Sequence, residues 1–259
     1  MDDRSTIAVL GLGEAGNLIA TGLVRAGVAV RGYDPRVAAP AGVHPAADAT
    51  EACRGADVVL SVNSAADALD ALTEGLPGCA PGTIWADLNT AAPAVKQAVE
   101  RAAGDLVDVV DVALMAPVPP LGLGTPMTVS GPRADAFAEA VARYGASVQV
   151  IEGPVGAAAT RKLLRSIFYK GMAAAVVEAL AAARVLGLDD WLTGNIAAEL
   201  VRADSSTLER LVTGSRVHAV RRTHEMQAAA ELLADLGVPA RVTLASRDWL
   251  TQLAVEGAQ

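Results

Sequence analysis

The sequence predicts an α/β protein, in which a doubly wound, mostly parallel sheet is followed by an all-α domain. Short apolar segments alternate with helical segments as far as Ile151, which is typical of a parallel sheet with helices on both faces. After Gly153 the strand pattern stops and several helical segments follow. We therefore divide the chain into residues 1–153 and 154–259, joined by a long interdomain helix.

The first predicted strand begins at Ile7 and leads into a glycine-rich turn. Glycines at this spacing let the backbone approach a pyrophosphate at the N-terminus of the next helix, which we expect over residues 17–26. A second strand, over residues 28–33, ends at Asp34, where a ribose-binding acid is expected. This order of elements predicts a Rossmann-type dinucleotide-binding unit. Its glycine turn would supply the cofactor contacts Gly11, Leu12, Gly13, Glu14, Ala15 and Gly16.

Two residues after the second strand bear on the choice of cofactor. Asp34 would accept a hydrogen bond from the ribose 2′-hydroxyl of NAD and would repel the 2′-phosphate of NADP. Arg36 could instead accommodate that phosphate. We expect NAD or NADP as the cofactor, with a preference for NAD because of Asp34.

Polar residues follow several of the remaining strands, which we expect over residues 57–62, 83–88, 107–113, 127–130 and 147–151. Helices are expected between them at about 65–72, 93–103 and 133–144. Ligands bind to doubly wound sheets at the C-terminal ends of the strands, so Val62, Asn63 and Thr90 are expected near the nicotinamide. Asn63 and Thr90 are equally suited to cap the helices that follow them.

The second domain begins with an expected helix over residues 157–186, about 45 Å long at the usual rise per residue. Later helices are expected over residues 190–201, 205–213, 217–236 and 242–256. These later helices are too few to cover a helix of such length. We therefore expect the long helix to pack against the first domain and against a second subunit, in a homodimer.

The long helix also carries the candidate for proton transfer, because the strand ends contain no histidine. Lys162, Ser166 and Lys170 share one helical face, with Arg165 and Tyr169 at its edge. A solvated face would show the same pattern. The apolar character of the rest of the helix favours the functional interpretation, because a partly desolvated lysine near other cations is suited to proton transfer.

Composition excludes several classes of protein. The net charge of −8 and the lack of a basic stretch argue against nucleic-acid binding. The apolar residues 171–188 are interrupted by Glu178 and Arg184, so we expect a buried helix and no membrane span. Cys53 and Cys79 lack metal-ligand spacing, which favours free thiols. With an acidic N-terminus unlike a signal peptide, the chain is expected to be a cytoplasmic protein without a metal ion.

Three segments carry a family resemblance: I-A-V-L-G-L-G-E-A-G at residues 7–16, D-L-N-T-A-A-P at 87–93 and G-P-V-G-A-A-A-T-R-K at 153–162. Together they resemble the 6-phosphogluconate dehydrogenase / β-hydroxyacid dehydrogenase superfamily, which includes imine reductases. The resemblance implies a dinucleotide-binding domain joined to an all-α domain through a long helix, usually in dimers. It also implies NAD(P)-linked oxidoreduction, with Lys162 as the general acid or base.

The chain departs from the superfamily at its substrate loop. Met115 replaces the serine that holds a substrate carboxylate, and Pro117 replaces a glycine. Ser166 replaces the asparagine usually found four residues after the lysine. These changes point away from a 3-hydroxyisobutyrate-type substrate. We expect a small anionic hydroxy or oxo compound, with contacts from Met115, Arg165, Ser166, Tyr169 and Lys170.

A second polar cluster, at residues 216–226, resembles a poorly characterised branch of the superfamily. His218, Arg222 and Glu225 fall on one side of the expected helix. They form either a salt-bridged surface or a group from which Arg222 reaches an anionic substrate.

Three functions follow from these observations. The first is an NAD(P)-dependent dehydrogenase or reductase with Lys162 as its proton-transfer group. The second is an imine reductase, in which Tyr169 could supply the acid. The third is a cofactor-binding sensor without catalysis, which the replaced serine and asparagine favour.

Overall fold

Eight strands form a single sheet within residues 5–257, the part of the chain that the computed structural model describes. Their spatial order is β3-β2-β1-β4-β5-β6-β7-β8. All neighbouring strands are parallel except β6 and β7. This order confirms the predicted doubly wound sheet. The strands are β1 (Thr6–Leu10), β2 (Ala29–Tyr33), β3 (His44–Pro45), β4 (Val58–Ser61), β5 (Ile84–Asp87), β6 (Asp108–Leu114), β7 (Met127–Ser130) and β8 (Val148–Val150).

The helices between the strands mostly follow the prediction. They are α1 (Glu14–Arg25), α2 (Ala49–Cys53), α3 (Ala68–Gly75), α4 (Pro93–Ala103), α5 (Val118–Leu121) and α6 (Ala134–Ala142). The predicted start of the first helix at residue 17 is wrong, because α1 begins directly after Gly13. The sequence did not predict β3, α2 or α5, since segments this short carry little periodicity.

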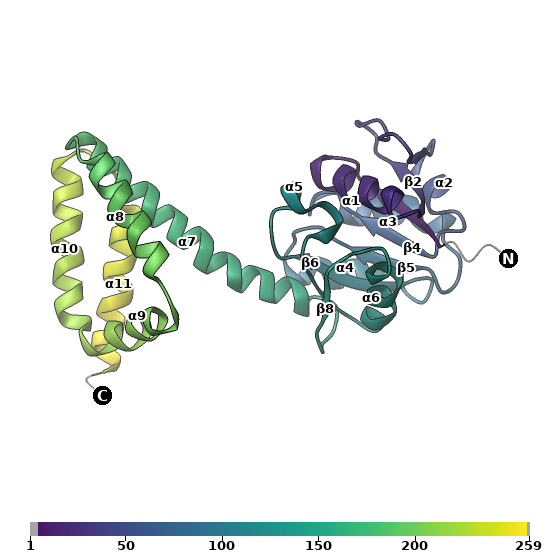
Figure 1. Cartoon of the computed structure of the whole chain (residues 1–259). Coiled ribbons are helices and arrows are strands. Elements are labelled where there is room, and N and C mark those ends of the chain that lie inside the picture. Colours follow the sequence, from purple (N-terminus) through teal and green to yellow (C-terminus); the bar gives the residue numbers. More distant parts are fainter. Residues whose placement is uncertain (1–4, 258–259) are drawn as a thin grey trace. The chain divides into compact units, whose positions relative to one another are not determined.

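Both faces of the sheet are buried by helices, as Figure 1 shows. Ile7 and Val9 of β1 belong to an apolar layer shared with α1 and α6. Ala8 and Leu10, which point to the opposite face, belong to a layer shared with α2, α3 and α4. A strand buried on both faces needs apolar residues at successive positions, which explains the continuous apolar run of β1.

Residues up to 165 form one compact unit, and residues from 166 on form another. The division lies inside α7 (Ala157–Val185), whereas the sequence-based boundary at 153/154 marks the point where strands give way to helices. The second unit also contains α8 (Asp189–Arg202), α9 (Ser205–Val217), α10 (Ala219–Asp235) and α11 (Arg241–Glu256). Within it, α10 and α11 lie side by side (Figure 1).

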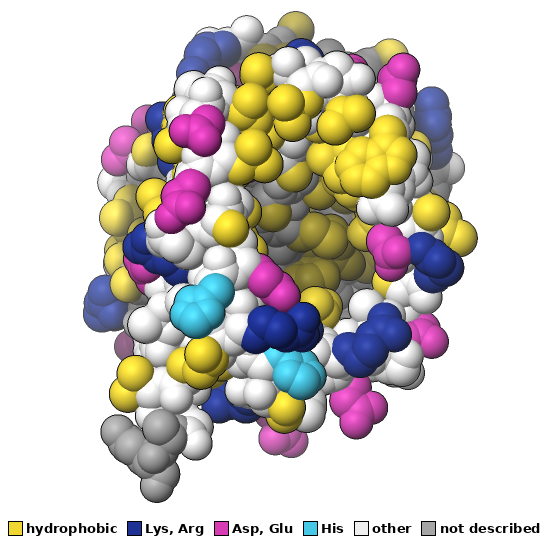
Figure 2. Space-filling view, turned by 90° about the vertical axis from the view of Figure 1, so that its left-hand side faces the viewer, with side chains coloured by type: hydrophobic (Ala, Val, Ile, Leu, Met, Phe, Trp, Pro, Cys, Tyr) yellow, Lys and Arg dark blue, Asp and Glu magenta, His cyan; other side chains and the backbone are white. Residues whose placement is uncertain are grey.

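The helical unit leaves many apolar side chains exposed. Neither α8 nor α9 contains a buried residue, and Figure 2 shows apolar side chains gathered on one face and around a hollow. Within residues 5–257, α7 alone is long and apolar enough to cross a membrane by length and composition, and 6% of its most apolar window is buried. The prediction of a buried helix over residues 171–188 is therefore wrong for the single chain, where Val177 is 68% exposed.

The two cysteines are free thiols, as predicted, but they are not isolated from each other. Cys53 is fully buried in α2, and Cys79 is partly buried after α3. A hydrogen bond with the Cys79 thiol, together with burial, raises the pKa of Cys53.

Candidate functional site

The glycine turn after β1 leaves no room for side chains at two of its positions. Gly11 has a φ of +94°, and a Cβ there would collide with the carbonyl oxygen of Val62. A Cβ on Gly16 would collide with the carbonyl oxygen of Gly11. These two glycines therefore allow the turn to close against the end of β4 and the first turn of α1.

Gly13 differs from these two glycines. Its φ of −60° and ψ of −168° are accessible to other residues, and a Cβ on it would meet no atom within 4 Å. Neither backbone strain nor packing within the chain explains this glycine. Gly13 precedes the N-terminus of α1, where free N–H groups and the helix dipole favour an anion. An open glycine at this place fits a pyrophosphate that approaches the backbone closely.

Asp34 connects the glycine turn to the segment that follows β2. One carboxylate oxygen accepts a hydrogen bond from the backbone nitrogen of Leu12 at 2.8 Å. The other accepts from the nitrogens of Arg36 at 2.8 Å and Val37 at 3.0 Å. Burial raises the pKa of Asp34, but the three hydrogen bonds lower it, and the net pKa lies below the ordinary 3.8. Sequence reasoning assigned Asp34 to the ribose and missed this bracing of the turn.

A pocket of about 460 Å³ brings together many of the predicted cofactor contacts. Acids line one side of it, because Asp67, Asp70 and Glu74 on and before α3 join Asp34 there. Arg36 is the cation among its lining residues. The predicted contacts that line the pocket are Gly11, Gly13, Asp34, Arg36, Val62 and Asn63.

The other predicted contacts of the turn lie beside this pocket. Leu12 and Gly16 are buried, Ala15 is partly buried and Glu14 is exposed at the start of α1. Asn63 does not cap a helix, since α3 begins after Asp67 and the Asn63 amide donates to Ser61 Oγ at 3.1 Å.

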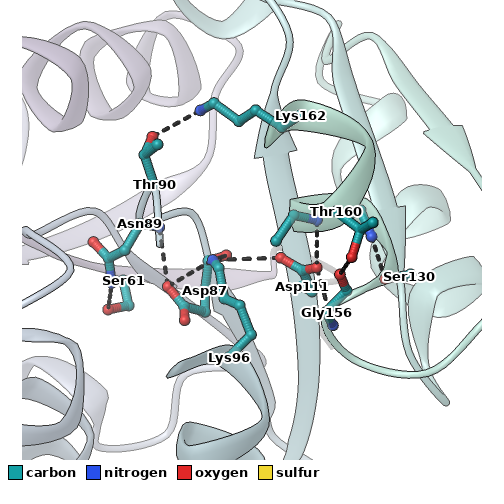
Figure 3. A network of polar contacts seen from close by, with 12 residues as sticks. Ser61, Asp87, Asn89, Thr90, Lys96, Asp111, Ser130, Gly156, Thr160 and Lys162 are labelled. Carbon is teal, nitrogen blue, oxygen red and sulfur yellow. Dashed lines mark hydrogen bonds and ion pairs between the residues drawn. The ribbon is translucent and has the colours of Figure 1, made fainter. Parts of the chain in front are cut away.

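Thr90 and Lys162 meet at the same edge of the sheet (Figure 3). The Lys162 ammonium donates a hydrogen bond to Thr90 Oγ1 at 2.7 Å. Thr90 follows β5 and does not cap α4, whose N-cap is Ala92. In the order β1-β4-β5, a dinucleotide with its pyrophosphate at the end of β1 would place its nicotinamide towards β4 and β5. Lys162 and Thr90 are therefore where the nicotinamide of such a dinucleotide would be expected.

Next to Thr90 lies a buried polar network that sequence reasoning did not find (Figure 3). The Asn89 side chain donates to Ser61 Oγ at 3.1 Å, and its backbone nitrogen donates to Asp87 Oδ1 at 2.9 Å. The Lys96 ammonium, on α4, lies 3.2 Å from Asp87 Oδ1 and 3.4 Å from Asp111 Oδ1. The other oxygen of Asp111 accepts hydrogen bonds from backbone nitrogens at the start of α7.

A signal for this network was present in the sequence. Lys96, Val99 and Ala103 are the buried residues of α4, and they recur at the spacing of one helical face. A lysine at the apolar spacing of a helix, with one acid at the end of a buried strand and another within the next strand, indicates a buried ion pair.

The predicted substrate contacts are divided between the two units. Met115 packs beside Ala113, Ile151 and Ala158, and its backbone nitrogen donates to the Pro126 carbonyl at 2.8 Å. Arg165 is exposed at the end of the first unit. Because α7 is one continuous helix, Ser166, Tyr169 and Lys170 follow Lys162 along it at the predicted spacing. The Tyr169 ring contacts Phe168 edge-on, with 5.0 Å between ring centroids.

The polar cluster at residues 216–226 makes contacts inside the helical unit. Arg222 donates to Ser215 Oγ at 2.8 Å, and Arg221 pairs with Glu225 at 3.0 Å. His218 lies between α9 and α10, not within one helix as predicted. These contacts are what the salt-bridged surface interpretation expects, and the reach of Arg222 to a substrate stays a prediction. Nowhere in residues 5–257 do three His, Cys, Asp or Glu side chains group so as to hold a metal ion.

Comparison with known families identifies two domains. Residues 6–118 match the NAD binding domain of 6-phosphogluconate dehydrogenase. Residues 183–253 match a domain of unknown function, DUF1932. The first match contains the glycine turn, the residues that line the acidic pocket and Thr90.

Individual relatives agree with this assignment. The NAD-dependent L-serine dehydrogenase of Pseudomonas aeruginosa is 29% identical over 211 residues, which are 77% of this chain and 70% of that protein. A solved conserved protein, described as structurally similar to 3-hydroxyacid dehydrogenases, is 27% identical with a TM-score of 0.62, over 97% of this chain and 99% of its own. The reductive aminase of Aspergillus terreus, solved with NADPH and ethyl levulinate, is 18% identical with a TM-score of 0.82, over 98% and 95% of the two chains. This last likeness shows a shared fold.

Proposed function

We propose that this chain, which belongs through its first domain to the 6-phosphogluconate dehydrogenase family, transfers hydride between NAD(P) and a small anionic hydroxy or oxo compound. NAD(P), when bound, supplies or accepts the hydride. The observation that carries the proposal is the 2.7 Å hydrogen bond from Lys162 to Thr90, at the sheet edge that also bears the glycine turn.

Lys162 is the proton-transfer residue in this proposal. During reduction, its ammonium protonates the oxygen of the developing alkoxide. During oxidation, its neutral amine takes the proton from the substrate hydroxyl. Thr90 Oγ1 accepts a hydrogen bond from the ammonium and so holds it at the sheet edge.

We propose NAD as the preferred cofactor, because of the charge of the pocket. A 2′-phosphate would meet the carboxylates of Asp34, Asp67, Asp70 and Glu74, with Arg36 as the lining cation. A 2′-hydroxyl carries no charge and can donate to a carboxylate. The acidic lining therefore favours NAD over NADP.

The substrate class follows from the chain's cations and from its relative. Arg165 and Lys170 lie on the same helix as Lys162 and supply charge for an anionic group. The 29% identical relative is named for L-serine, a hydroxy acid with an amino group. We propose a small hydroxy acid or its oxo form, with Met115 in contact with its apolar part.

We further propose a homodimer with α7 at the interface. Leu164 is 62% exposed and Ile167 is 72% exposed, so this helix presents large apolar side chains to the surroundings of the single chain. A second copy of the chain has the same apolar face on its own α7, and pairing about a twofold axis would bury both faces against each other. The same burial would explain why a helix of membrane-like composition occurs in a protein that we place in the cytoplasm.

A substrate panel with purified protein tests the function. NADH and NADPH are offered with oxo acids, and NAD and NADP with hydroxy acids including L-serine. Lys162→Met should lower turnover by about 100-fold or more, because general acid–base groups contribute that much, while NADH affinity stays within a few-fold. Arg184→Met, in the last turn of the same helix, is the control and should turn over normally.

Other results would select the alternatives. Reduction of cyclic imines alone, with loss of activity in Tyr169→Phe, would indicate an imine reductase. Cofactor binding without hydride transfer to any compound would indicate a sensor. Normal turnover by Lys162→Met would remove Lys162 from the mechanism.

A further inference from the structure

Lys96 is a buried cation without a part in the reaction proposed above. Its side chain is 1% exposed, and it donates a hydrogen bond to the Asp87 carbonyl oxygen at 2.7 Å. Two carboxylates flank it, with Asp87 Oδ1 at 3.2 Å and Asp111 Oδ1 at 3.4 Å. A lysine is rarely buried so completely unless it is paired, and removing one partner of such a pair leaves an uncompensated charge.

Each of the two acids holds one of the segments that form the Lys162–Thr90 contact. Asp111 Oδ2 accepts hydrogen bonds from the backbone nitrogens of Gly156 at 3.1 Å and Ala159 at 2.8 Å. Ala159 precedes Lys162 by nearly one helical turn, so this bond fixes the start of α7 directly before the lysine. Asp87 Oδ1 accepts from the nitrogen of Asn89, the residue before Thr90.

These contacts form a closed circuit. It runs from Lys162 to Thr90, through Asn89 to Asp87, across Lys96 to Asp111, and along the first turn of α7 back to Lys162 (Figure 3). Lys96 is the link between its two halves. Asp111 Oδ1 makes no hydrogen bond to any described residue, so the ammonium of Lys96 is what balances its charge.

We infer that Lys96 is a positioning residue for Lys162, acting through Asp87 and Asp111. The inference rests on the proposed role of Lys162. Without Lys96, two buried carboxylates would face each other with no cation between them, and each would turn towards water or another donor. The backbone of Asn89 and the first turn of α7 would then lose their acceptors. Thr90 and Lys162 would separate although neither was changed.

The test uses the small number of lysines. The chain has three, at positions 96, 162 and 170. Reductive dimethylation with 13C-formaldehyde would label Lys162 and Lys170, while buried Lys96 is protected in the folded protein. The Lys162 methyl signal, assigned by its loss in Lys162→Arg, reports the surroundings of its nitrogen without any need for turnover. Lys170 on the same helix serves as the internal reference.

In Lys96→Met, the Lys162 signal should move towards that of Lys170, while the Lys170 signal stays in place. The Asp111→Asn variant keeps nearly the shape of the original side chain but loses the ion pair with Lys96. It supplies the test if Lys96→Met does not fold. A purely structural role predicts a lower Tm with an unchanged Lys162 signal. An unchanged signal in folded Lys96→Met or in folded Asp111→Asn would overturn the inference.

Kinetics supply the second readout. In both variants, kcat should fall about tenfold or more, as expected for a misplaced catalytic group, while the KM for cofactor changes less than about twofold. If the chain proves not to be an oxidoreductase, this readout is lost but the methyl signals still test the positioning of Lys162. The failure of the function and the failure of the inference are therefore distinguishable.

Discussion

The carboxylate of Asp34 lies 2.8 Å from the backbone nitrogen of Leu12, so the end of β2 is hydrogen-bonded to the glycine turn at the end of β1. The same side chain holds the nitrogens of Arg36 and Val37. One acid thus holds together two segments that line the pocket, the glycine turn and the residues that follow β2. Its ionisation should matter for the stability of the protein as well as for binding.

Stability that depends on Asp34 should be lost in acid. Because the pKa of Asp34 in the folded protein lies below the ordinary 3.8, the folded state favours the ionised carboxylate. The stabilisation is complete above the unfolded pKa and disappears as the pH falls through the folded one. The Tm of the wild type should therefore drop between about pH 5 and about pH 3, and Asp34→Asn should lose part of that dependence. Asp105→Asn, at an exposed acid, is the control, and equal pH dependence in all three proteins would contradict the prediction.

Alanine substitutions at two glycines of the turn should have different effects, one on cofactor affinity and the other on folding. Gly13→Ala should fold normally, because its Cβ meets no atom of the chain, but NADH affinity should fall about tenfold, equivalent to 1.4 kcal/mol. Gly16→Ala should lower the Tm or prevent folding, because its Cβ collides with the Gly11 carbonyl. Gly194→Ala, in open space on α8, should slightly stabilise the chain. Normal NADH binding by Gly13→Ala would show that the pyrophosphate does not bind at this turn.

The acidic wall should set the cofactor preference. Neutralising α3 in the double variant Asp70→Asn, Glu74→Gln should raise NADPH affinity relative to NADH by about threefold or more. Arg36→Gln should act in the opposite direction, lowering NADPH affinity with little effect on NADH. Fluorescence titration at low and high salt would measure both ratios, and salt should shrink the differences. If the ratio of NADPH affinity to NADH affinity were the same in all variants, these side chains would not distinguish a 2′-phosphate from a 2′-hydroxyl.

The exposed face of α7 should control the oligomeric state. Ile167→Glu and Val177→Glu place charges on side chains that are 72% and 68% exposed in the single chain, and each should convert a dimer to a monomer. Leu106→Glu, at a side chain that is 63% exposed in the other unit, should leave the dimer intact. Light scattering coupled to size exclusion would give the masses. A monomeric wild type at micromolar concentration would refute the homodimer.

The sequence predicts those parts of this protein whose signal is local. The bounds of α4 and β7 agree with the predicted residues 93–103 and 127–130, because apolar spacing and turn residues delimit them. Lys162, named from its place on the long helix, does contact Thr90, named from a strand end. The position of Thr90 follows from the rule that parallel strands present their C-terminal ends at one edge, and that of Lys162 from the helical face that it shares with Ser166 and Lys170.

The features that the sequence did not predict depend on contacts between segments that are not adjacent in the chain. Lys96 is buried because strands β5 and β6 bring Asp87 and Asp111 to either side of it, and no local pattern contains both acids. The hydrogen bond between Asp34 and Leu12 was not predicted, because no local pattern shows that these two residues are in contact. The burial expected for residues 171–188 was also wrong for the single chain, since apolar composition does not show which surface, if any, covers a helix.

The balance of two acids against one lysine also limits how this protein can evolve. A change of Lys96 alone would leave two buried carboxylates without a cation. A change of either acid alone would remove a hydrogen-bond acceptor from a segment next to Lys162 or Thr90. Homologues should therefore show positions 87, 96 and 111 substituted together, with a neutral residue at 96 accompanied by the loss of an acid. Three sites on two strands and the helix between them are expected to be inherited as one unit.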